Sequence, residues 1–410
     1  MKKLLSILAS VLASAGIAYG ATVALTTGPQ NPADIALIVN TLVNSINSGV
    51  TPNSMAPPAQ NRNFADNGGM NINQQGTGTI TGGTTTITAL QFAADRWFID
   101  TNVGSGAGQA AVITASPAPP VGFTQAVKMW RNSGALLQPV CTLHEIETTR
   151  ATQLQGQMVV LSAFVQPLAG LTSASGAIQM YVIYGTGTDQ GLGTLTASPA
   201  ITPAWTGIAG GTTALAAGTG SASMNLGTTA VWTRPFTVPF AIPITATEVG
   251  VEICFTPVGS ASGATDGFAY TGVQLEILGP NATAPSTFEF KPLAYETQQA
   301  QRFFWQLNEP ASGAGLPAWG EATGATATAW TFPLPVQMRG TTPVVAIPTT
   351  GTFKTNIAGT ATTWVTPTAG VCSVFACTIT GGNTNTAGQV EQVTGGGGTG
   401  VVYVKSDVIM

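Results

Sequence analysis

Few residues in this chain have the types and spacing that catalysis requires. The densest group of ionisable side chains is His144-Glu145-Ile146-Glu147, and His144 is the sole histidine. A Ser-His-Asp triad would have to use His144, yet no Gly-x-Ser-x-Gly sequence at a strand-to-helix turn supplies a serine. In a strand, His144 and Ile146 would face one way and Glu145 and Glu147 the other. We expect a surface or interface strand here and no catalytic residue.

Paired carboxylates are the second arrangement with chemical potential, because two of them can hydrolyse a glycosidic bond. Asp95 with Asp100, and Glu145 with Glu147, are close in sequence. Neither pair lies in a recognisable catalytic setting, so we expect that the protein is not an enzyme. The single histidine excludes multi-histidine zinc sites. The run Gly395–Gly398 lacks the Lys-Ser/Thr of a phosphate-binding loop.

Two kinds of ligand-binding residue remain. Loop acids and backbone oxygens bind calcium, so Asp66 and Asp266, with Asn67 beside the first, are candidates for a Ca²⁺ site. No other cofactor is expected. Sugar rings stack on exposed aromatic side chains, and four tryptophans lie near loop-like residues. Each is either a sugar platform or a core or interface residue: Trp130, Trp205, Trp232 and Trp319.

The composition narrows the classes of function further. Only 7% of the 410 residues are charged, against about 25% in an ordinary soluble domain. Thirteen Lys and Arg residues and a net charge of -4 give no electrostatic footprint for nucleic acid. A surface with so few charges must be covered by neighbouring chains or by Thr, Ser, Asn and Gln. We therefore expect a homo-oligomer and no nucleic-acid partner.

The N-terminal segment has the pattern of a secretory signal. Lys2 and Lys3 precede an apolar stretch, Leu4–Tyr19, and small residues stand before a cleavage point at Ala21. The alternative is a retained apolar helix that inserts into a partner. A second helix, amphipathic and about 15 residues long, is expected after the capping Asn31. It serves either core packing or trimerisation.

The four cysteines match no metal motif. Cys141 and Cys254 lie in strand-like runs and are expected in the core. Cys372 and Cys377 form either a small-loop disulfide or a pair of buried thiols. The cysteines alone do not decide the redox compartment.

Strands, more than helices, must position these residues, because Thr, Val, Gly and Pro are abundant and Glu, Lys and Arg are scarce. Short β-runs separated by turn residues favour a sandwich; examples are Met158–Val165, Glu248–Phe255, Gly272–Ile277 and Ser373–Ile379. The organisation that we predict is an apolar and helical segment at 1–60, a β-sandwich at 61–292, and a linker helix with a smaller C-terminal β-domain at 293–410.

The order of several short motifs carries a resemblance to a known family. The motifs are Asn61–Gly69, Asp95–Trp97, Leu154–Val165, Gly272–Glu276, Thr287–Pro292, Gln301–Phe304 and Pro335–Arg339. Taken in this order, 60–410 resembles the carbohydrate-binding-module-like β-sandwich of tail-fibre, collar and other virion proteins of tailed bacteriophages. The resemblance implies an all-β, jelly-roll-like sandwich followed by a small C-terminal β-domain.

Within these motifs we expect mainly structural roles. Trp97 is an apolar anchor, and Arg96 either stacks on an aromatic ring or pairs with Asp95. Alternation in a strand puts Gln274 and Glu276 on the face opposite Val273 and Leu275. Glu289 is expected to hold the linker, together with Lys291. Arg302 and Arg339 are expected to have defined carboxylate or carbonyl partners.

The sequence therefore predicts a non-enzymatic virion structural protein: a fibre, collar or capsid-surface component, trimeric, in contact with portal, capsid or tail proteins and with host-surface glycans. The alternative is a bacterial surface adhesin exported through a cleaved N-terminal signal. A glycan depolymerase is a third reading.

Overall fold

The structure is a computed structural model. It describes residues 62–74, 80–81, 92–101, 108–131, 139–172, 177–190, 196–197, 201–202, 205–207, 222–225, 231–258, 265–279, 282–308, 315–324, 327–339, 343–349, 354–357, 360–363, 365–382, 390–394 and 401–405. The signal-like segment and the amphipathic helix predicted within 1–60 lie outside these residues. None of the described helices is both long and apolar enough to cross a membrane.

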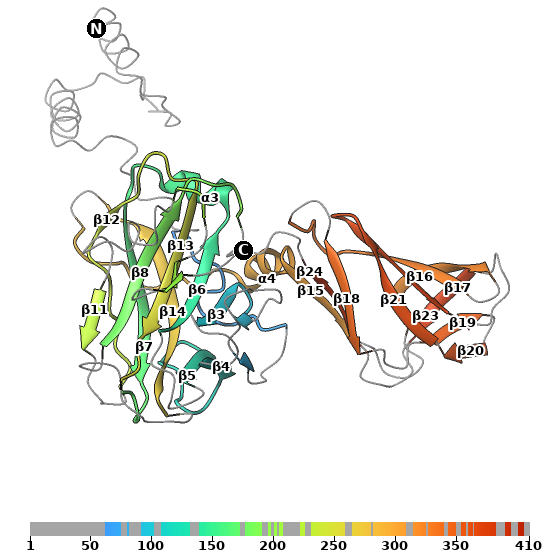
Figure 1. Cartoon of the computed structure of the whole chain (residues 1–410), viewed down its shortest axis with the longest axis horizontal. Helices are drawn as coiled ribbons and strands as arrows, with labels where there is room; N and C mark the ends of the chain where they lie inside the picture. Colours follow the sequence, from blue (N-terminus) through green and yellow to red (C-terminus); the bar gives the residue numbers. More distant parts are fainter. Residues whose placement is uncertain are drawn as a thin grey trace, which may run out of the picture. The chain divides into compact units, whose positions relative to one another are not determined.

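The first sheet of the sandwich has six strands. Their spatial order is β1 (Ile80–Thr81), β4 (Gly108–Ile113), β5 (Ala126–Arg131), β14 (Gly267–Ile277), β7 (Met158–Pro167) and β12 (Phe240–Ala241). Neighbouring strands in this sheet are antiparallel, and β14 lies between β5 and β7. Figure 1 shows these strands in blue to yellow.

The second sheet also has six strands, in the order β11 (Ala222–Asn225), β8 (Ala177–Gly185), β13 (Glu248–Phe255), β6 (Val140–Ile146), β3 (Trp97–Thr101) and β2 (Phe92–Ala94). A separate pair is formed by β9 (Thr196–Ala197) and β10 (Ile201–Thr202). The predicted all-β class is confirmed. The expectation of a surface or interface strand at His144 was wrong, because all seven residues of β6 are buried within this chain, with β13 and β3 on either side.

One apolar core lies between the two sheets. Alternate residues of β13, among them Val249 and Val251, meet Leu161 of β7 and Leu275 of β14 there. Period-two alternation puts every second side chain on this inner face. The hydroxyl groups of Thr142 and Tyr270, 2.6 Å apart, join the sheets within the core. The core side chains determine which face of each strand points inward. The strand register therefore sets the positions of the polar residues on the same strands.

Short helices connect the sheets. After β6 the chain forms α3 (Thr148–Ala151) and a 3₁₀ turn at Thr152–Leu154. The predicted linker helix is present as α4 (Leu293–Gln301), which begins after Pro292, a residue that favours helix starts.

The strands after α4 form two further sheets with their own core. The smaller contains β15 (Phe304–Asn308), β24 (Val401–Lys405) and β18 (Val344–Thr349). The larger follows the order β20 (Thr360–Thr363), β19 (Lys354–Ile357), β23 (Val390–Thr394), β16 (Gly315–Gly324), β17 (Ala327–Pro333), β22 (Ala376–Gly382) and β21 (Val365–Cys372). Trp330, Phe332 and Met338 are in this second core. The run 373–379 is split, since a turn at 373–375 precedes β22.

Two disulfides close strand pairs. Cys141 of β6 lies opposite Cys254 of β13, and these two core residues are bonded to each other. Cys372 and Cys377 are bonded across the turn between β21 and β22. The sequence left the second pair open between a disulfide and two thiols, and it did not anticipate the first bond.

Candidate functional site

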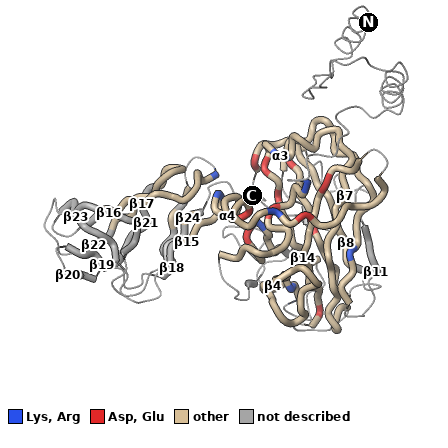
Figure 2. The backbone as a smooth tube through the Cα atoms, turned by 180° about the vertical axis from the view of Figure 1, so that it is seen from behind, with Lys and Arg blue, Asp and Glu red and all other residues tan. Residues whose placement is uncertain are grey.

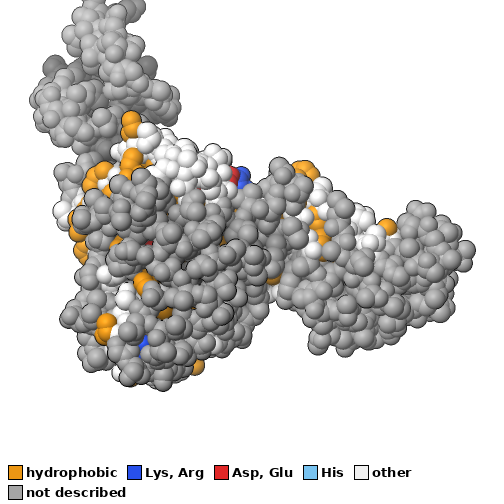
Figure 3. Space-filling view, viewed as in Figure 1, with side chains coloured by type: hydrophobic (Ala, Val, Ile, Leu, Met, Phe, Trp, Pro, Cys, Tyr) orange, Lys and Arg blue, Asp and Glu red, His pale blue; other side chains and the backbone are white. Residues whose placement is uncertain are grey.

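The placement of charged residues is the most unusual property of the described chain. Thirteen acidic or basic side chains are buried: Asp66, Asp95, Arg96, Arg131, Glu145, Glu147, Glu248, Glu252, Asp266, Glu276, Glu289, Lys291 and Glu296. The other charged side chains that the structure describes are half-buried, and none is fully exposed. In Figure 2 many of the charged positions gather near α3 and α4. The described surface in Figure 3 is mostly neutral, with few charged atoms.

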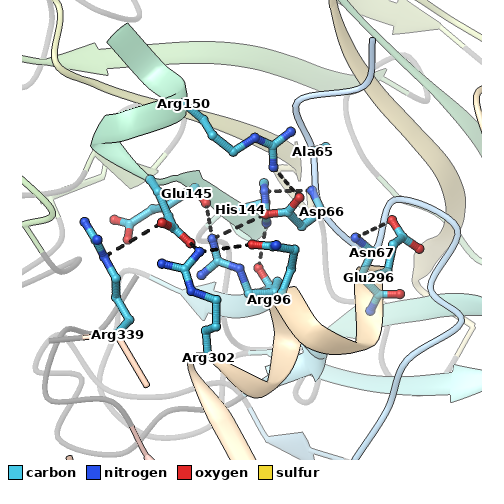
Figure 4. A network of polar contacts seen from close by, with 12 residues as sticks. Ala65, Asp66, Asn67, Arg96, His144, Glu145, Arg150, Glu296, Arg302 and Arg339 are labelled. Atoms are coloured by element: carbon cyan, nitrogen blue, oxygen red, sulfur yellow. Dashed lines mark hydrogen bonds and ion pairs between the residues drawn. The ribbon is translucent and has the colours of Figure 1, made fainter. Parts of the chain in front are cut away.

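Asp66 is the centre of the largest cluster (Figure 4). Its carboxylate pairs with Arg150, with Lys291 at 3.3 Å and with Arg96 at 4.0 Å. Burial by itself would raise the pKa of Asp66, but the charges of Arg150, Lys291, Arg96 and His144 hold that pKa well below its usual value. The three basic side chains around this carboxylate compensate its negative charge and would repel Ca²⁺. The structure therefore argues against Asp66 as a calcium ligand.

His144 is locked by hydrogen bonds on both ring nitrogens. Nε2 accepts the backbone N–H of Asp66 at 3.1 Å, and Nδ1 lies 2.9 Å from the carbonyl oxygen of Arg96. A neutral ring protonated at Nδ1 satisfies both contacts. Burial, and then the charge of Arg96, lower the pKa of His144 to about 3. The ring stacks on Trp97 with centroids 4.9 Å apart. No ring nitrogen remains for proton transfer.

Arg96 and Trp97 anchor the turn between β2 and β3. Arg96 has a φ of 72°, in the left-handed region. Its guanidinium lies 3.7 Å from the ring centroid of Phe303 and donates to the carbonyl oxygen of Glu145 at 2.7 Å. Of the two predicted roles, aromatic stacking is found, and the ion-pair partner is Asp66. The indole N–H of Trp97 donates to the carbonyl of Asp66 at 3.0 Å.

Asp95 instead binds Gln74. Its two oxygens accept the backbone N–H of Gln74 at 3.0 Å and the side-chain amide of Gln74 at 2.5 Å. The same amide donates to the carbonyl of Phe304 at 2.8 Å. Burial raises the pKa of Asp95 to about 6, although the bonds from Gln74 oppose the shift. The side chain of Asp100 lies outside the described residues, so the proposed Asp95–Asp100 pair is not seen.

The segment before α4 is bonded to the start of the sandwich. Glu289 Oε2 accepts the backbone N–H of Asn63 at 2.6 Å, and Lys291 Nζ donates to the carbonyl of Ala65 at 3.0 Å. Glu296 in α4 accepts the backbone N–H of Asn67 at 2.9 Å. Burial raises the pKa of Glu296 to about 7, against the opposing charge of Lys291. The predicted role of Glu289 and Lys291 in holding the linker agrees with these contacts.

Gln274 and Glu276 face away from the core residues Val273 and Leu275, as alternation predicts. Gln274 Oε1 accepts the backbone N–H of Glu289 at 2.7 Å. Glu276 accepts the backbone N–H and the hydroxyl of Ser286, both at 2.6 Å. The segment containing Ser286 and Glu289 thus covers the outer side of β14, which explains why both polar residues are buried.

Arg302 and Arg339 share one carboxylate. Arg302 pairs with Glu147 at 2.8 Å, and Arg339 Nε lies 3.8 Å from the other oxygen of Glu147. Arg339 also pairs with Asp189, and its backbone N–H donates to the carbonyl of Arg302 at 2.7 Å. The prediction of defined partners for both arginines is confirmed. Figure 4 shows both guanidinium groups directed toward this region.

The second calcium candidate, Asp266, is also fully engaged. It pairs with Arg131 at 2.5 Å and accepts the backbone N–H and the hydroxyl of Thr172. Its carboxylate oxygens are already occupied by these donors. The structure therefore argues against a calcium site at Asp266, as it does at Asp66.

Of the four tryptophans, two are buried and have no open face for a sugar. Trp130 donates to Gln109 at 2.8 Å, and Trp205 donates to Glu145 at 3.0 Å. Trp232 is half-buried and donates to the carbonyl of Ala118 at 2.7 Å. Trp319 is in β16, opposite Thr331, and its side chain lies outside the described residues.

The arrangement as a whole is a clamp, which we define as Asp66, Arg96, His144, Glu147, Arg150, Lys291, Glu296, Arg302 and Arg339. It joins the start of the sandwich, the end of β6, the linker helix and the chain after β17. Each ionised group has an opposite charge or a hydrogen bond, and a buried pair that loses one partner costs about 3–5 kcal/mol. Sequence reasoning found Arg302 and Arg339 but missed the central role of Asp66; the local signal was the polar run from Asn61 to Gly69.

No protein-family model matches the chain, and no curated protein matches it. Several solved structures are similar to it, among them the following three. The enzymatically active domain of tailspike protein 4 of bacteriophage CBA120 has a TM-score of 0.29 and 10% identity, covering 53% of this chain and 22% of its own. A xylan-binding domain from carbohydrate-binding module 22 has a TM-score of 0.24 and 11% identity, covering 46% and 90%.

The third is the arabinose-bound α-L-arabinofuranosidase MgGH51, with a TM-score of 0.27, 13% identity, and coverage of 54% of this chain and 30% of its own. This chain therefore spans less than a third of the length of the tailspike and arabinofuranosidase chains. Structural similarity at TM-scores this low does not indicate a function. The functional assignment therefore depends on the residues of this chain.

Proposed function

We propose that this protein is a non-enzymatic structural component of a tailed-bacteriophage virion, as a fibre, collar or capsid-surface protein. The observation that carries the proposal is the distribution of charge: the described acidic and basic side chains are buried or half-buried, and the surface is neutral. Burying an unpaired charge at an interface is costly. A neutral surface lets identical copies pack closely without that cost, which suits a permanent assembly.

The assembly that we propose is a homotrimer in contact with portal, capsid or tail proteins. Glycans on the host surface are the proposed distal ligand. Several copies held together would bind glycans through many weak contacts, so avidity would replace affinity at a single site. Among the candidate tryptophans whose side chains the structure describes, Trp232 is the one that is half-buried, and it is our candidate for such a contact.

The clamp supports the non-enzymatic part of the proposal. His144 is buried, neutral and bonded at both nitrogens. Glu147 is neutralised by Arg302. A general acid or base must reach the proton that it transfers, and neither residue is open to a substrate.

A second candidate, an exported bacterial adhesin, is favoured by one specific observation. The two disulfides, Cys141–Cys254 and Cys372–Cys377, are of a kind that persists in oxidising compartments. Export through a cleaved signal before Ala21 would place the chain in such a compartment. An experiment must therefore distinguish a protein that is part of a virion from one that is exported to the outside of a bacterium.

Peptide mass spectrometry of gradient-purified particles and of particle-free culture fluid tests the proposal. We expect peptides of this chain to co-sediment with the particles in a constant ratio to the major capsid protein. Recovery only from the particle-free fluid would favour the adhesin. Incubation of the purified protein with host polysaccharide should leave its viscosity unchanged; a fall in viscosity would show a depolymerase instead.

A further inference from the structure

Two buried glutamates outside the clamp, Glu145 and Glu248, form no ion pair with any of the described residues. Glu145 lies opposite Gly250 in the β6–β13 register, so Glu248, two residues from Gly250, is a diagonal neighbour on the same face. Glu147 has Arg302 as a partner. Among the described residues, no Lys or Arg side chain forms an ion pair with Glu145 or Glu248.

Each of the two carboxyl groups has one oxygen bonded and one oxygen unpartnered. The indole N–H of Trp205 donates to Glu145 Oε1 at 3.0 Å, and the backbone N–H of Gln190 donates to Glu248 Oε1 at 2.5 Å. Both Oε2 atoms are buried and have no hydrogen-bond partner in the described structure. The side chains are 1% and 2% exposed. A buried polar atom without a partner is rare in native proteins.

Trp205 closes this part of the sheet. A Cβ atom built at Gly250 would lie 2.9 Å from Cη2 of Trp205, and one at Gly185 would lie 3.0 Å from its Cβ. The indole thus packs directly on backbone at two glycines. The packing holds the indole where its N–H donates to Glu145.

We propose that Glu145 and Glu248 bind a divalent cation, Ca²⁺, through their Oε2 atoms. Carboxylate oxygens are preferred ligands of this hard cation, which completes its coordination with backbone carbonyls and water. A doubly charged ion compensates both carboxylates at once, whereas one shared proton compensates only one. Burial, and then the mutual repulsion of the two groups, raise the pKa of Glu145 well above its usual value, although the charge of Arg96 opposes the shift. Burial raises that of Glu248 to about 7.

Terbium luminescence on the full-length protein tests this site. Tb³⁺ replaces Ca²⁺ at oxygen sites and emits when a nearby tryptophan is excited, and Trp205 is bonded to the proposed ligand Glu145. After treatment with EDTA, we expect saturable emission that Ca²⁺ displaces, and a rise in the thermal midpoint with Ca²⁺. E145Q/E248Q should lower the affinity for Tb³⁺ and for Ca²⁺, which these two responses report, at least about tenfold. W205F removes the nearest sensitising tryptophan and should lose most of the emission.

Asp95→Asn is the matched control, because Asp95 is another buried acid but both its oxygens are bonded to Gln74. It should keep the Ca²⁺ response. The proposal is overturned if the wild-type protein shows neither response, or if folded E145Q/E248Q keeps both. If the double variant does not fold, E248Q alone gives the same decision. A third outcome is that neither ion has an effect and E145Q/E248Q is more stable than the wild-type protein at pH 8. That outcome would show that the two carboxyl groups share a proton and do not bind a cation.

Discussion

Asp66 balances three basic side chains that have little access to water. Arg96 and Lys291 are almost fully buried and Arg150 is largely so. Asp66→Asn keeps the shape of the side chain and removes the shared negative charge. Because an uncompensated buried charge costs about 3–5 kcal/mol, we expect a loss of that size in the free energy of unfolding, measured by urea denaturation.

The control for this variant is Asp95→Asn. Asp95 is equally buried but contacts the neutral Gln74, so its loss should be smaller. Equal losses in D66N and D95N would contradict the central role that we assign to Asp66.

His144 offers a second test at this scale, because it is the sole histidine and gives one imidazole signal. Its pKa is lowered to about 3, so the ring should stay neutral, with the proton on Nδ1, from pH 5 to pH 8. Nitrogen-15 NMR of protein labelled at histidine measures both the protonation and the tautomer. A titration near the ordinary pKa of about 6.5 would mean that the ring is solvated and that the contact with Asp66 is wrong.

At the scale of elements, the disulfide between β6 and β13 is the main covalent constraint in the sandwich. It joins residues 113 apart in sequence, whereas the second disulfide joins residues 5 apart. Closure of a longer loop removes more entropy from the unfolded chain. We expect C141A/C254A to lose about 5 kcal/mol and C372A/C377A about 2 kcal/mol in urea denaturation. The reverse order would show that packing, and not loop closure, dominates.

The strands and the linker helix were largely predictable because they depend on local pattern. The apolar run 158–165 and the alternating run 272–277 lie within β7 and β14, and α4 begins after Pro292. Burial of β6 was not predictable, because His144 and Glu145 become tolerable inside only through partners distant in sequence. The same holds for the bond from Cys141, which requires the β6–β13 register.

Charge pairing escaped prediction for a similar reason. Arg302 and Arg339 were recognised as needing partners because charges are scarce around them, but no local pattern identifies Glu147 as the shared carboxylate. The pairing of Asp66 and Asp266 with basic side chains likewise depends on tertiary contacts. A loop acid in sequence therefore looks the same whether it binds a metal or an arginine.

For the whole molecule, the buried acids determine how stability depends on pH. In the metal-free protein the pKa is raised for Asp95 to about 6, for Glu248 and Glu296 to about 7, and for Glu145 well above its usual value. Between about pH 4.5 and 7 the folded state therefore binds more protons than the unfolded state, and stability falls as pH rises. We expect the thermal midpoint in EDTA to decrease from pH 5 to pH 8.

Asp66 acts in the opposite direction and only at lower pH. Its pKa is held well below the ordinary 3.8, so its contribution is present above that pH and is lost as pH falls below it. Maximal stability is therefore expected near about pH 4–5. A thermal midpoint that instead rises from pH 5 to pH 8 would contradict the burial of these acids.

The neutral surface is the property on which the proposed assembly depends. An ordinary monomer carries its charged side chains on its surface. Here many of the described charged side chains are buried, in the clamp and in the contacts of β14. Such a molecule should persist as part of a larger particle and not as a free monomer.

The most direct test of this account is the native mass of the protein released from purified phage particles, together with the intact mass of each chain. We expect a full-length chain and a native mass three times that of the chain. A monomer that begins at Ala21 and is found free in the culture fluid would contradict the virion assignment.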